Sequence, residues 1–234
     1  MVNENPIIVA LDLNTAADAI VMATSVAPYV GAFKIGLGLL HGPGPGTIDA
    51  LVQLGKPVFV DAKLHDIPSQ VEAAAERLAT HGARWVTAHV GGGFDMLEAA
   101  VEGLSRGAAQ AEAGILGVSV LTSLDKFDLE RIGIQRSPGE LVGKMSKVAT
   151  AAQCEGLICS AHEINTVKQA APSLKTFVPG IRLGSHSDDQ SRTATPSDAL
   201  ARGASYLVIG RPIIAASDPP AAANAIWHSL RSKE

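Results

Sequence analysis

The sequence is poor in cysteine, in aromatic residues and in net charge, and each shortage narrows the class of protein. It has two cysteines, Cys154 and Cys159, whose spacing fits neither a C-x-x-C motif nor a zinc pattern, so we expect two buried, reduced thiols. Aromatic residues make up 4% of the chain and hydrophobic residues 47%, which favours a layered α/β interior over a β-sandwich. A net charge of −4 gives no sign of a nucleic-acid-binding surface.

Long apolar runs and targeting signals are also missing. No hydrophobic stretch approaches membrane-spanning length, and residues 1–6 contain neither a basic region nor an apolar signal core. The length of 234 residues suits one large domain, and no low-complexity linker divides it. We therefore expect a soluble, cytoplasmic protein with one domain over residues 1–234 and with no membrane or nucleic-acid partner.

Short apolar segments alternate with helical segments along the whole chain. Capping patterns mark several helix starts, as at 15–18, 137–140, 160–163 and 195–198. Eight strand–helix units that close on themselves predict an α/β fold, a (β/α)8 TIM barrel, whereas a doubly wound sheet usually stops at about five or six strands. The expected strands are 7–12, 31–36, 57–60 with its continuation to Asp61 and Lys63, 84–89, 115–121, 156–159, 175–178 and 206–209, and a helix is expected over 66–81.

The strongest chemical signal is the stretch 61–68, Asp-Ala-Lys-Leu-His-Asp-Ile-Pro, directly after a buried strand. Because side chains alternate along a strand, Asp61 and Lys63 should point to one face, and Asp66 follows past the strand end. Burial disfavours a charged lysine, but two nearby carboxylates keep the ammonium protonated, ready to donate a proton. The same charges would also fit a salt-bridge layer that closes the barrel mouth. We favour catalysis, because buried ion pairs seldom add much stability.

Polar residues gather where the expected strands end, which is the face where barrel enzymes hold their active sites. Gly210 and Arg211 suggest a phosphate site, since glycine lets backbone N–H groups approach an anion and arginine supplies a fork of donors. A surface arginine at a helix start is the simpler explanation, but Arg182 and the polar loop 184–192, a candidate lid, strengthen the first one. The strand-end residues are Asp12, Lys34, Asp61, Lys63, His89, Thr122, Arg182 and Arg211.

Together these motifs resemble the orotidine 5'-monophosphate (OMP) decarboxylase family, in its bacterial form, over nearly the whole chain. The resemblance implies a cofactor-free carboxy-lyase that converts OMP to UMP and CO2 in de novo pyrimidine biosynthesis. It also implies a homodimer with shared active sites. The motifs that carry it are 9–12, Lys34, 61–68, 121–123, 179–182, 189–192 and 209–212.

The resemblance implies a role for each matching residue. The catalytic residues would be Lys34, Asp61, Lys63 and Asp66, an alternating charge network in which Lys63 protonates the C6 carbanion and Asp66 reaches into the neighbouring subunit's site. Asp12 and Lys34 would hold the ribose, and Thr122 would lie near the pyrimidine. At Gln70 the family usually has a threonine that contacts the partner's ribose. The other substrate-binding residues would be Ile67, Arg182, Gln190, Gly210 and Arg211.

Two alternatives remain open. Mg²⁺-dependent sugar-phosphate enzymes of the same barrel family, such as 3-keto-gulonate 6-phosphate decarboxylase and hexulose-phosphate synthase, share Asp-x-Lys-x-x-Asp. They carry a glutamate where Lys34 stands, so Lys34 argues against them. A non-catalytic phosphate-ligand sensor would have no need of a clustered charge network. The histidines at 65, 81, 162 and 228 form no metal set, so we expect no metal site, and the resemblance implies that no cofactor is needed.

Overall fold

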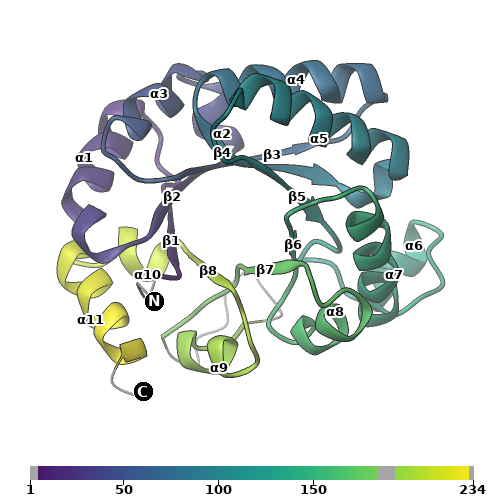
Figure 1. Cartoon of the computed structure of the whole chain (residues 1–234). Coiled ribbons are helices and arrows are strands. Elements are labelled where there is room, and N and C mark those ends of the chain that lie inside the picture. The colour runs from purple at the N-terminus through teal and green to yellow at the C-terminus, as the bar shows by residue number, and fades with distance from the viewer. Residues whose placement is uncertain (1–4, 184–192, 232–234) are drawn as a thin grey trace.

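The chain folds into a closed parallel barrel wrapped by helices (Figure 1). The computed structural model describes residues 5–183 and 193–231, and these contain eight strands. The strands are β1 Ile7–Ala10, β2 Ala32–Ile35, β3 Val58–Leu64, β4 Ala83–His89, β5 Gly114–Val118, β6 Gly156–Ile158, β7 Lys175–Val178 and β8 Tyr206–Ile209. Each strand pairs with the next, and β8 pairs with β1 to close the ring. The predicted (β/α)8 barrel is therefore confirmed.

The helices lie outside the barrel and cover its strands (Figure 1). They are α1 Ala16–Val26, α2 Leu37–His41, α3 Gly46–Val52, α4 Pro68–Thr80, α5 Phe94–Ala108, α6 Lys126–Arg131, α7 Pro138–Ala151, α8 Ile164–Ala170, α9 Pro196–Ala201, α10 Arg211–Ile214 and α11 Pro219–Arg231. The helix expected over 66–81 is α4, which begins at a proline that suits the first helical position. Within the described parts of the chain, no helix has the length and apolar character of a membrane span.

Side-chain caps start the helices largely where the sequence predicted them. The Thr15 hydroxyl accepts the Asp18 N–H at 3.1 Å before α1, and a full capping box precedes α7. The prediction of a helix start at Ser160 is wrong. There the Glu163 carboxylate accepts the Ser160 N–H at 2.9 Å within a turn, and α8 begins only after Glu163.

Strand β5 is shorter than the sequence suggested. It ends at Val118, not at residue 121, because the next residue leaves the ladder. The Ser119 hydroxyl donates to the Ile158 carbonyl at 2.7 Å, so a side chain takes the place of the expected backbone pairing with β6. Residues 119–123 are thereby released from the sheet to form part of the barrel mouth.

Aromatic rings fill the barrel interior, although aromatic residues are scarce in the chain. Phe177 packs against Phe59, Trp85 and Tyr206 with ring centroids 4.6–6.1 Å apart. They are joined by apolar side chains from other strands. The lower part of the barrel is thus a packed core, and any binding site must lie above it, towards the carboxyl ends of the strands.

The amino-terminal end of the barrel is closed by a group of charges that we call the Glu155 network. Arg84 and Lys175 nitrogens lie 2.6 and 3.0 Å from the Glu155 carboxylate, and the Trp85 indole donates to it at 3.1 Å. Burial raises the pKa of Glu155, but hydrogen bonds from Arg84, Trp85 and Lys175 outweigh it and leave that pKa below its ordinary value. This network lies at the end of the barrel opposite the carboxyl ends of the strands, so we assign it a role in stabilising the fold.

Strand β3 departs from regular pairing where the sequence predicted chemistry. Residues 61–63 lie opposite Thr87 alone, between the pairs Val60–Val86 and Leu64–Ala88. Within this bulge Lys63 has a φ of +49°, in the left-handed region. Asp61 and Lys63 do meet at one cavity, as predicted, but the bulge and not regular strand alternation brings Lys63 there.

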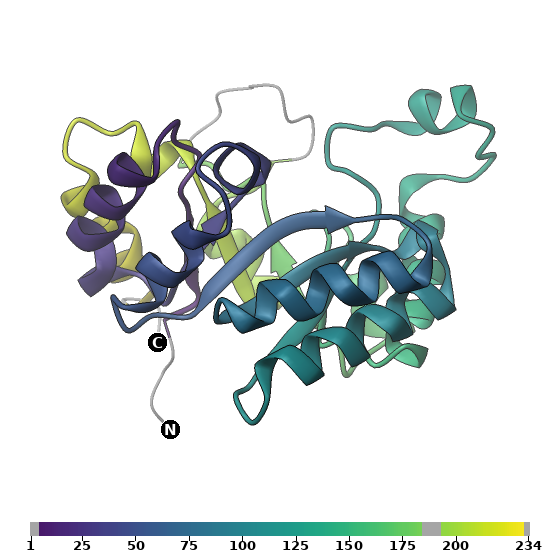
Figure 2. The ribbon, with the colours of Figure 1, turned by 90° about the horizontal axis from the view of Figure 1, so that it is seen from above.

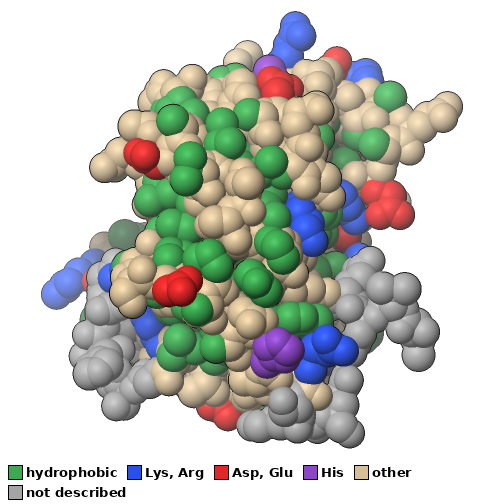
Figure 3. Space-filling view, turned by 90° about the vertical axis from the view of Figure 1, so that its left-hand side faces the viewer, with side chains coloured by type: hydrophobic (Ala, Val, Ile, Leu, Met, Phe, Trp, Pro, Cys, Tyr) green, Lys and Arg blue, Asp and Glu red, His purple; other side chains and the backbone are tan. Residues whose placement is uncertain are grey.

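Two surface features stand out beyond the barrel. Figure 2 shows α6 standing away from the body of the molecule, and its Phe127 is 67% exposed. Figure 3 views the side on which α1 lies in Figure 1, where hydrophobic side chains gather among few charged ones. Val21 of α1 is 71% exposed.

Candidate active site

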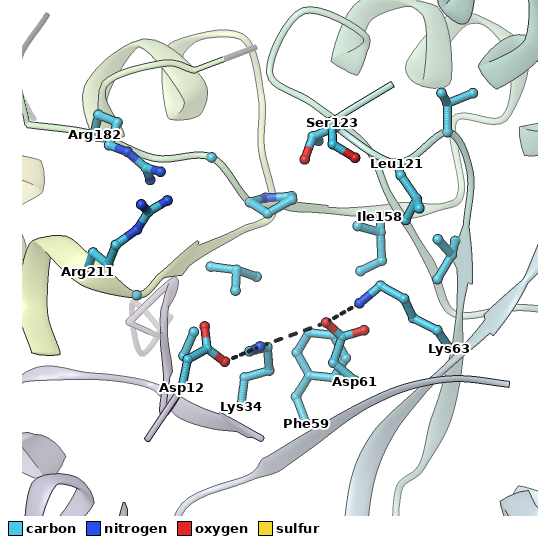
Figure 4. Close-up of a pocket in the computed structure, with 18 residues that line it drawn as sticks. Asp12, Lys34, Phe59, Asp61, Lys63, Leu121, Ser123, Ile158, Arg182 and Arg211 are labelled. Atoms are coloured by element: carbon cyan, nitrogen blue, oxygen red, sulfur yellow. Dashed lines mark hydrogen bonds and ion pairs between the residues drawn. The ribbon is translucent and has the colours of Figure 1, made fainter. Parts of the chain in front are cut away.

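Charged side chains of alternating sign cross the barrel mouth in a row (Figure 4). The Lys34 Nζ lies 2.9 Å from Asp12 Oδ1 and 3.8 Å from Asp61 Oδ2. The Lys63 Nζ lies 2.7 Å from the same oxygen of Asp61. The row therefore reads minus, plus, minus, plus from Asp12 to Lys63. It forms because β1, β2 and β3 are parallel neighbours, so their carboxyl ends meet at one face.

Burial is greatest in the middle of this row. The Lys34 and Asp61 side chains are 9% and 17% exposed, while Lys63 and Asp12 at the ends are 31% and 57% exposed. Solvent screens the central pairs least, which strengthens their mutual attraction. The Lys63 ammonium is held by Asp61 yet remains accessible to a bound molecule.

The row borders a cavity of about 330 Å³ at the barrel mouth. Apolar side chains from inside the barrel form its floor: Ala10, Phe59, Val118, Ile158 and Val208. Arg182 and Arg211 lie together on one side with their guanidinium groups directed inward, and Lys63 lies on the other side (Figure 4). The cavity thus has a basic side suited to an anionic group and a second side where Lys63 and Asp61 meet.

Most of the predicted site residues meet at this cavity. Its lining includes Asp12, Lys34, Asp61, Lys63, Thr122, Arg182, Gly210 and Arg211. Asp66 and Gln70 instead line a neighbouring cavity of about 540 Å³, which Lys63 also borders. Ile67 is 62% exposed, and its N–H donates to Asp66 Oδ1 at 2.7 Å. Gln190 lies outside the described residues.

The sequence reasoning missed Thr87, Leu121 and Ser123. Leu121 and Ser123 line the cavity beside Thr122, in the segment that leaves β5 early. Thr87 lies in β4, fully buried, and its hydroxyl contacts both Asp61 and Lys63. A threonine in a strand indicates only high β-propensity, so its residue type gave no sign of a role in the site. The useful signal was its spacing, since Thr87 follows Trp85 by two and so shares its interior face.

His89 is the last residue of β4 and is absent from the described cavity lining. Its ring centroid is 5.2 Å from that of His65. Burial, His65 and Lys63 lower the pKa of His89, and Asp61 opposes them only in part. His89 is therefore neutral at pH 7, and it borders the site without entering it.

The sulfur chemistry of the chain plays no part in this site. Cys154 and Cys159 are both buried thiols, as expected, and burial raises the pKa of Cys154 to about 12. Among residues 5–183 and 193–231, no group of three or more His, Cys, Asp or Glu side chains is placed to hold a metal ion.

A closed parallel barrel with a charged cavity at the carboxyl ends of its strands defines the chain as a TIM-barrel enzyme. The sequence profile of the Orotidine 5'-phosphate decarboxylase / HUMPS family matches residues 5–226. The chain therefore belongs to this family, and the resemblance inferred from its motifs is confirmed.

Individual relatives are similar over nearly their whole length. The orotidine 5'-phosphate decarboxylase of Anaeromyxobacter sp. (strain K) is 44% identical over 223 residues, which cover 94% of this chain and 96% of that protein. The enzyme of the same name from Paramagnetospirillum magneticum is 41% identical over a match that covers 97% of this chain and 98% of that protein. The crystal structure of orotidine 5'-phosphate decarboxylase from Lactobacillus acidophilus has a TM-score of 0.85 and 33% sequence identity, and the match covers 97% of this chain and 99% of that one.

Proposed function

We propose that this protein decarboxylates OMP to UMP and CO2, a step of de novo pyrimidine biosynthesis. Its similarity to orotidine 5'-phosphate decarboxylases over nearly the whole chain supports this activity. The observation that carries it is the pairing of Lys63 with Asp61 at 2.7 Å, across the cavity from Arg182 and Arg211. A phosphorylated nucleotide bound with its phosphate at the arginines would extend its base towards this pair.

Lys63 acts as the proton donor. When the bond between C6 and the carboxylate breaks, its electron pair stays on C6 in the plane of the ring, where the ring π-system cannot delocalise it. The Lys63 ammonium stabilises this charge and transfers a proton to C6, and solvent then restores the proton to the lysine. Asp61 holds the ammonium in its charged form, and Lys34 on the other side of Asp61 fixes the carboxylate between two cations.

The rest of the cavity supplies binding energy away from the reacting carbon. Arg182 and Arg211 bind the phosphate, aided by the backbone at Gly210. Asp12 and Lys34 bind the ribose hydroxyls, and Thr122 contacts the pyrimidine. Gln190, which lies outside the described residues, is assigned to the phosphate as well. Binding energy at the phosphate helps to position C6 against Lys63, which raises the rate of the chemical step.

The active form is a homodimer in which each subunit completes the site of the other. Asp66, Ile67 and Gln70 support this, because all three are exposed to a second chain and because Asp66 and Gln70 line a second cavity that Lys63 also borders. Asp66 of the partner subunit would extend the alternating charges beyond Lys63. Ile67 and Gln70 of the partner subunit would contact the substrate, with the Gln70 amide in place of a threonine hydroxyl.

The test is the fall in absorbance when purified protein is mixed with OMP in the presence of EDTA. Wild type should turn OMP over, and Lys63→Ala should lose nearly all activity while remaining folded, because it removes both the cation and the proton donor. Lys147→Ala, at an exposed lysine of α7, is the matched control and should behave like wild type. Substantial activity in Lys63→Ala would contradict the assigned role.

Two other outcomes would redirect the assignment. Activity that EDTA abolishes and Mg²⁺ restores would favour a sugar-phosphate enzyme of the same family. Tight UMP binding by wild type without any OMP turnover would favour a phosphate-ligand sensor.

A further inference from the structure

Thr87 lies directly behind the row of charges, although it touches no part of the cavity that a substrate would fill. It is fully buried in β4, above Trp85 in the barrel interior, and is absent from the described cavity lining. A buried hydroxyl needs hydrogen-bond partners, and the partners of Thr87 both belong to the Asp61–Lys63 segment.

The hydroxyl of Thr87 makes two directed hydrogen bonds. It accepts the backbone N–H of Lys63 at 2.8 Å and donates to Asp61 Oδ1 at 3.0 Å. The other carboxylate oxygen, Asp61 Oδ2, faces the ammonium groups of Lys34 and Lys63 at 3.8 and 2.7 Å. With Oδ1 tied to Thr87, the carboxylate cannot rotate about its Cβ–Cγ bond without breaking this bond. Thr87 therefore aims Oδ2 at the lysines.

The hydrogen bond to the Lys63 N–H also satisfies a backbone donor within the bulge of β3. The bulge sets residues 61–63 against Thr87 alone, so regular ladder pairing cannot satisfy every N–H of this stretch. The Thr87 side chain supplies the acceptor that the ladder does not. It does so at Lys63, whose φ of +49° is unfavourable for a side chain larger than glycine. One hydroxyl thus holds both the strained backbone of the lysine and the carboxylate that pairs with it.

We propose that Thr87 is a positioning residue for the decarboxylation, and that its hydroxyl fixes the Lys63 ammonium in line with C6 of the substrate. This proposal rests on the proposed function. Since Thr87 lies outside the phosphate and ribose contacts, its loss should lower kcat far more than it raises KM. Small misplacement of a catalytic group commonly costs about 100-fold in rate.

The decisive variant is Thr87→Val, which keeps the shape of the side chain and removes the hydroxyl. We expect kcat to fall about 10- to 100-fold, with KM and UMP affinity within about threefold of wild type. Thr87→Ser keeps the hydroxyl and should recover most of kcat. If Thr87→Val does not fold, Thr87→Cys takes its place, and its weakly bonding thiol should give a kcat well below that of the serine variant.

Thr176→Val is the matched control. Thr176 is also fully buried in a barrel strand, and its hydroxyl also accepts a backbone N–H, that of Ser205 at 3.1 Å, near the amino-terminal end of the barrel. The Thr176→Val variant should have a lower thermal stability than wild type but an unchanged kcat. Equal losses of kcat in Thr87→Val and Thr176→Val, or an unchanged kcat in Thr87→Val, would overturn the role of Thr87. A folded wild type that does not turn over OMP would instead overturn the proposed function, and the role of Thr87 with it.

Discussion

Replacing Asp61 with asparagine would remove the anion that separates two ammonium groups. The Lys34 and Lys63 nitrogens lie 3.8 and 2.7 Å from the same carboxylate oxygen, and both side chains are at most 31% exposed. Because both nitrogens contact this one oxygen, they are at most about 6.5 Å apart, and at an effective dielectric constant of about 20 two unit charges at that distance repel by about 2.5 kcal/mol. An asparagine amide keeps the shape of the side chain but cannot offset this repulsion.

The repulsion favours the loss of a proton from one lysine, and with it the donor for C6. If a repulsion of about 2.5 kcal/mol raised the free energy of the transition state in full, kcat/KM would drop about 70-fold. Steady-state kinetics with OMP, followed by absorbance, measure this loss, and a thermal melt checks folding. Glu112→Gln is the control, because it neutralises an 89% exposed carboxylate that pairs with Arg84 at the opposite end of the barrel. An Asp61→Asn protein with more than about a fifth of wild-type kcat/KM would refute the electrostatic reasoning.

Two further predictions address binding and stability. Arg211→Ala should raise the KM for OMP about 10- to 100-fold through loss of a charge-assisted phosphate contact. A KM for OMP equal to that of wild type would mean that the phosphate does not bind at Arg211. Glu155→Gln should destabilise the fold at pH 7 by about 1–3 kcal/mol, since hydrogen bonds from its neighbours hold the pKa of Glu155 below its ordinary value. At pH values between the ordinary pKa of a glutamate and the lower pKa of Glu155 in the folded protein, the unfolded chain therefore binds more protons than the folded one. The contribution of Glu155 is therefore present at neutral pH and disappears across this acidic window. Thermal melts of both proteins between pH 3 and pH 7 should converge at the acid end, and a constant difference would contradict the assignment.

Local sequence patterns were sufficient for the barrel and for the face that carries the site. Apolar strand segments, helix caps and turn residues act over a few neighbours, so their positions can be recognised without knowing the rest of the chain. Once the strands are parallel and closed, their carboxyl ends must share one rim. That is why Asp12, Lys34, Asp61 and Arg211 could be placed together before the structure was known.

The sequence was a poorer guide wherever a contact joins two strands. Alternation along β3 could not reveal the bulge, because the bulge depends on how β3 pairs with β4. It also could not indicate that Lys34 lies closer to Asp12 than to Asp61. Asp66 lies within the 61–68 motif and Gln70 just after it, yet they face a different cavity from the one that Asp61 lines.

The fold, the family and the identity of the charged residues at the barrel mouth could therefore be predicted from the amino-acid sequence. The oxygen that each lysine meets, and the part of Thr87 in holding Asp61 and Lys63 together, became apparent from the folded chain. The physical reason is the range of the forces involved. Hydrophobic periodicity and capping are properties of neighbouring residues, whereas a hydrogen bond of about 3 Å depends on the final register between strands that are distant in the chain.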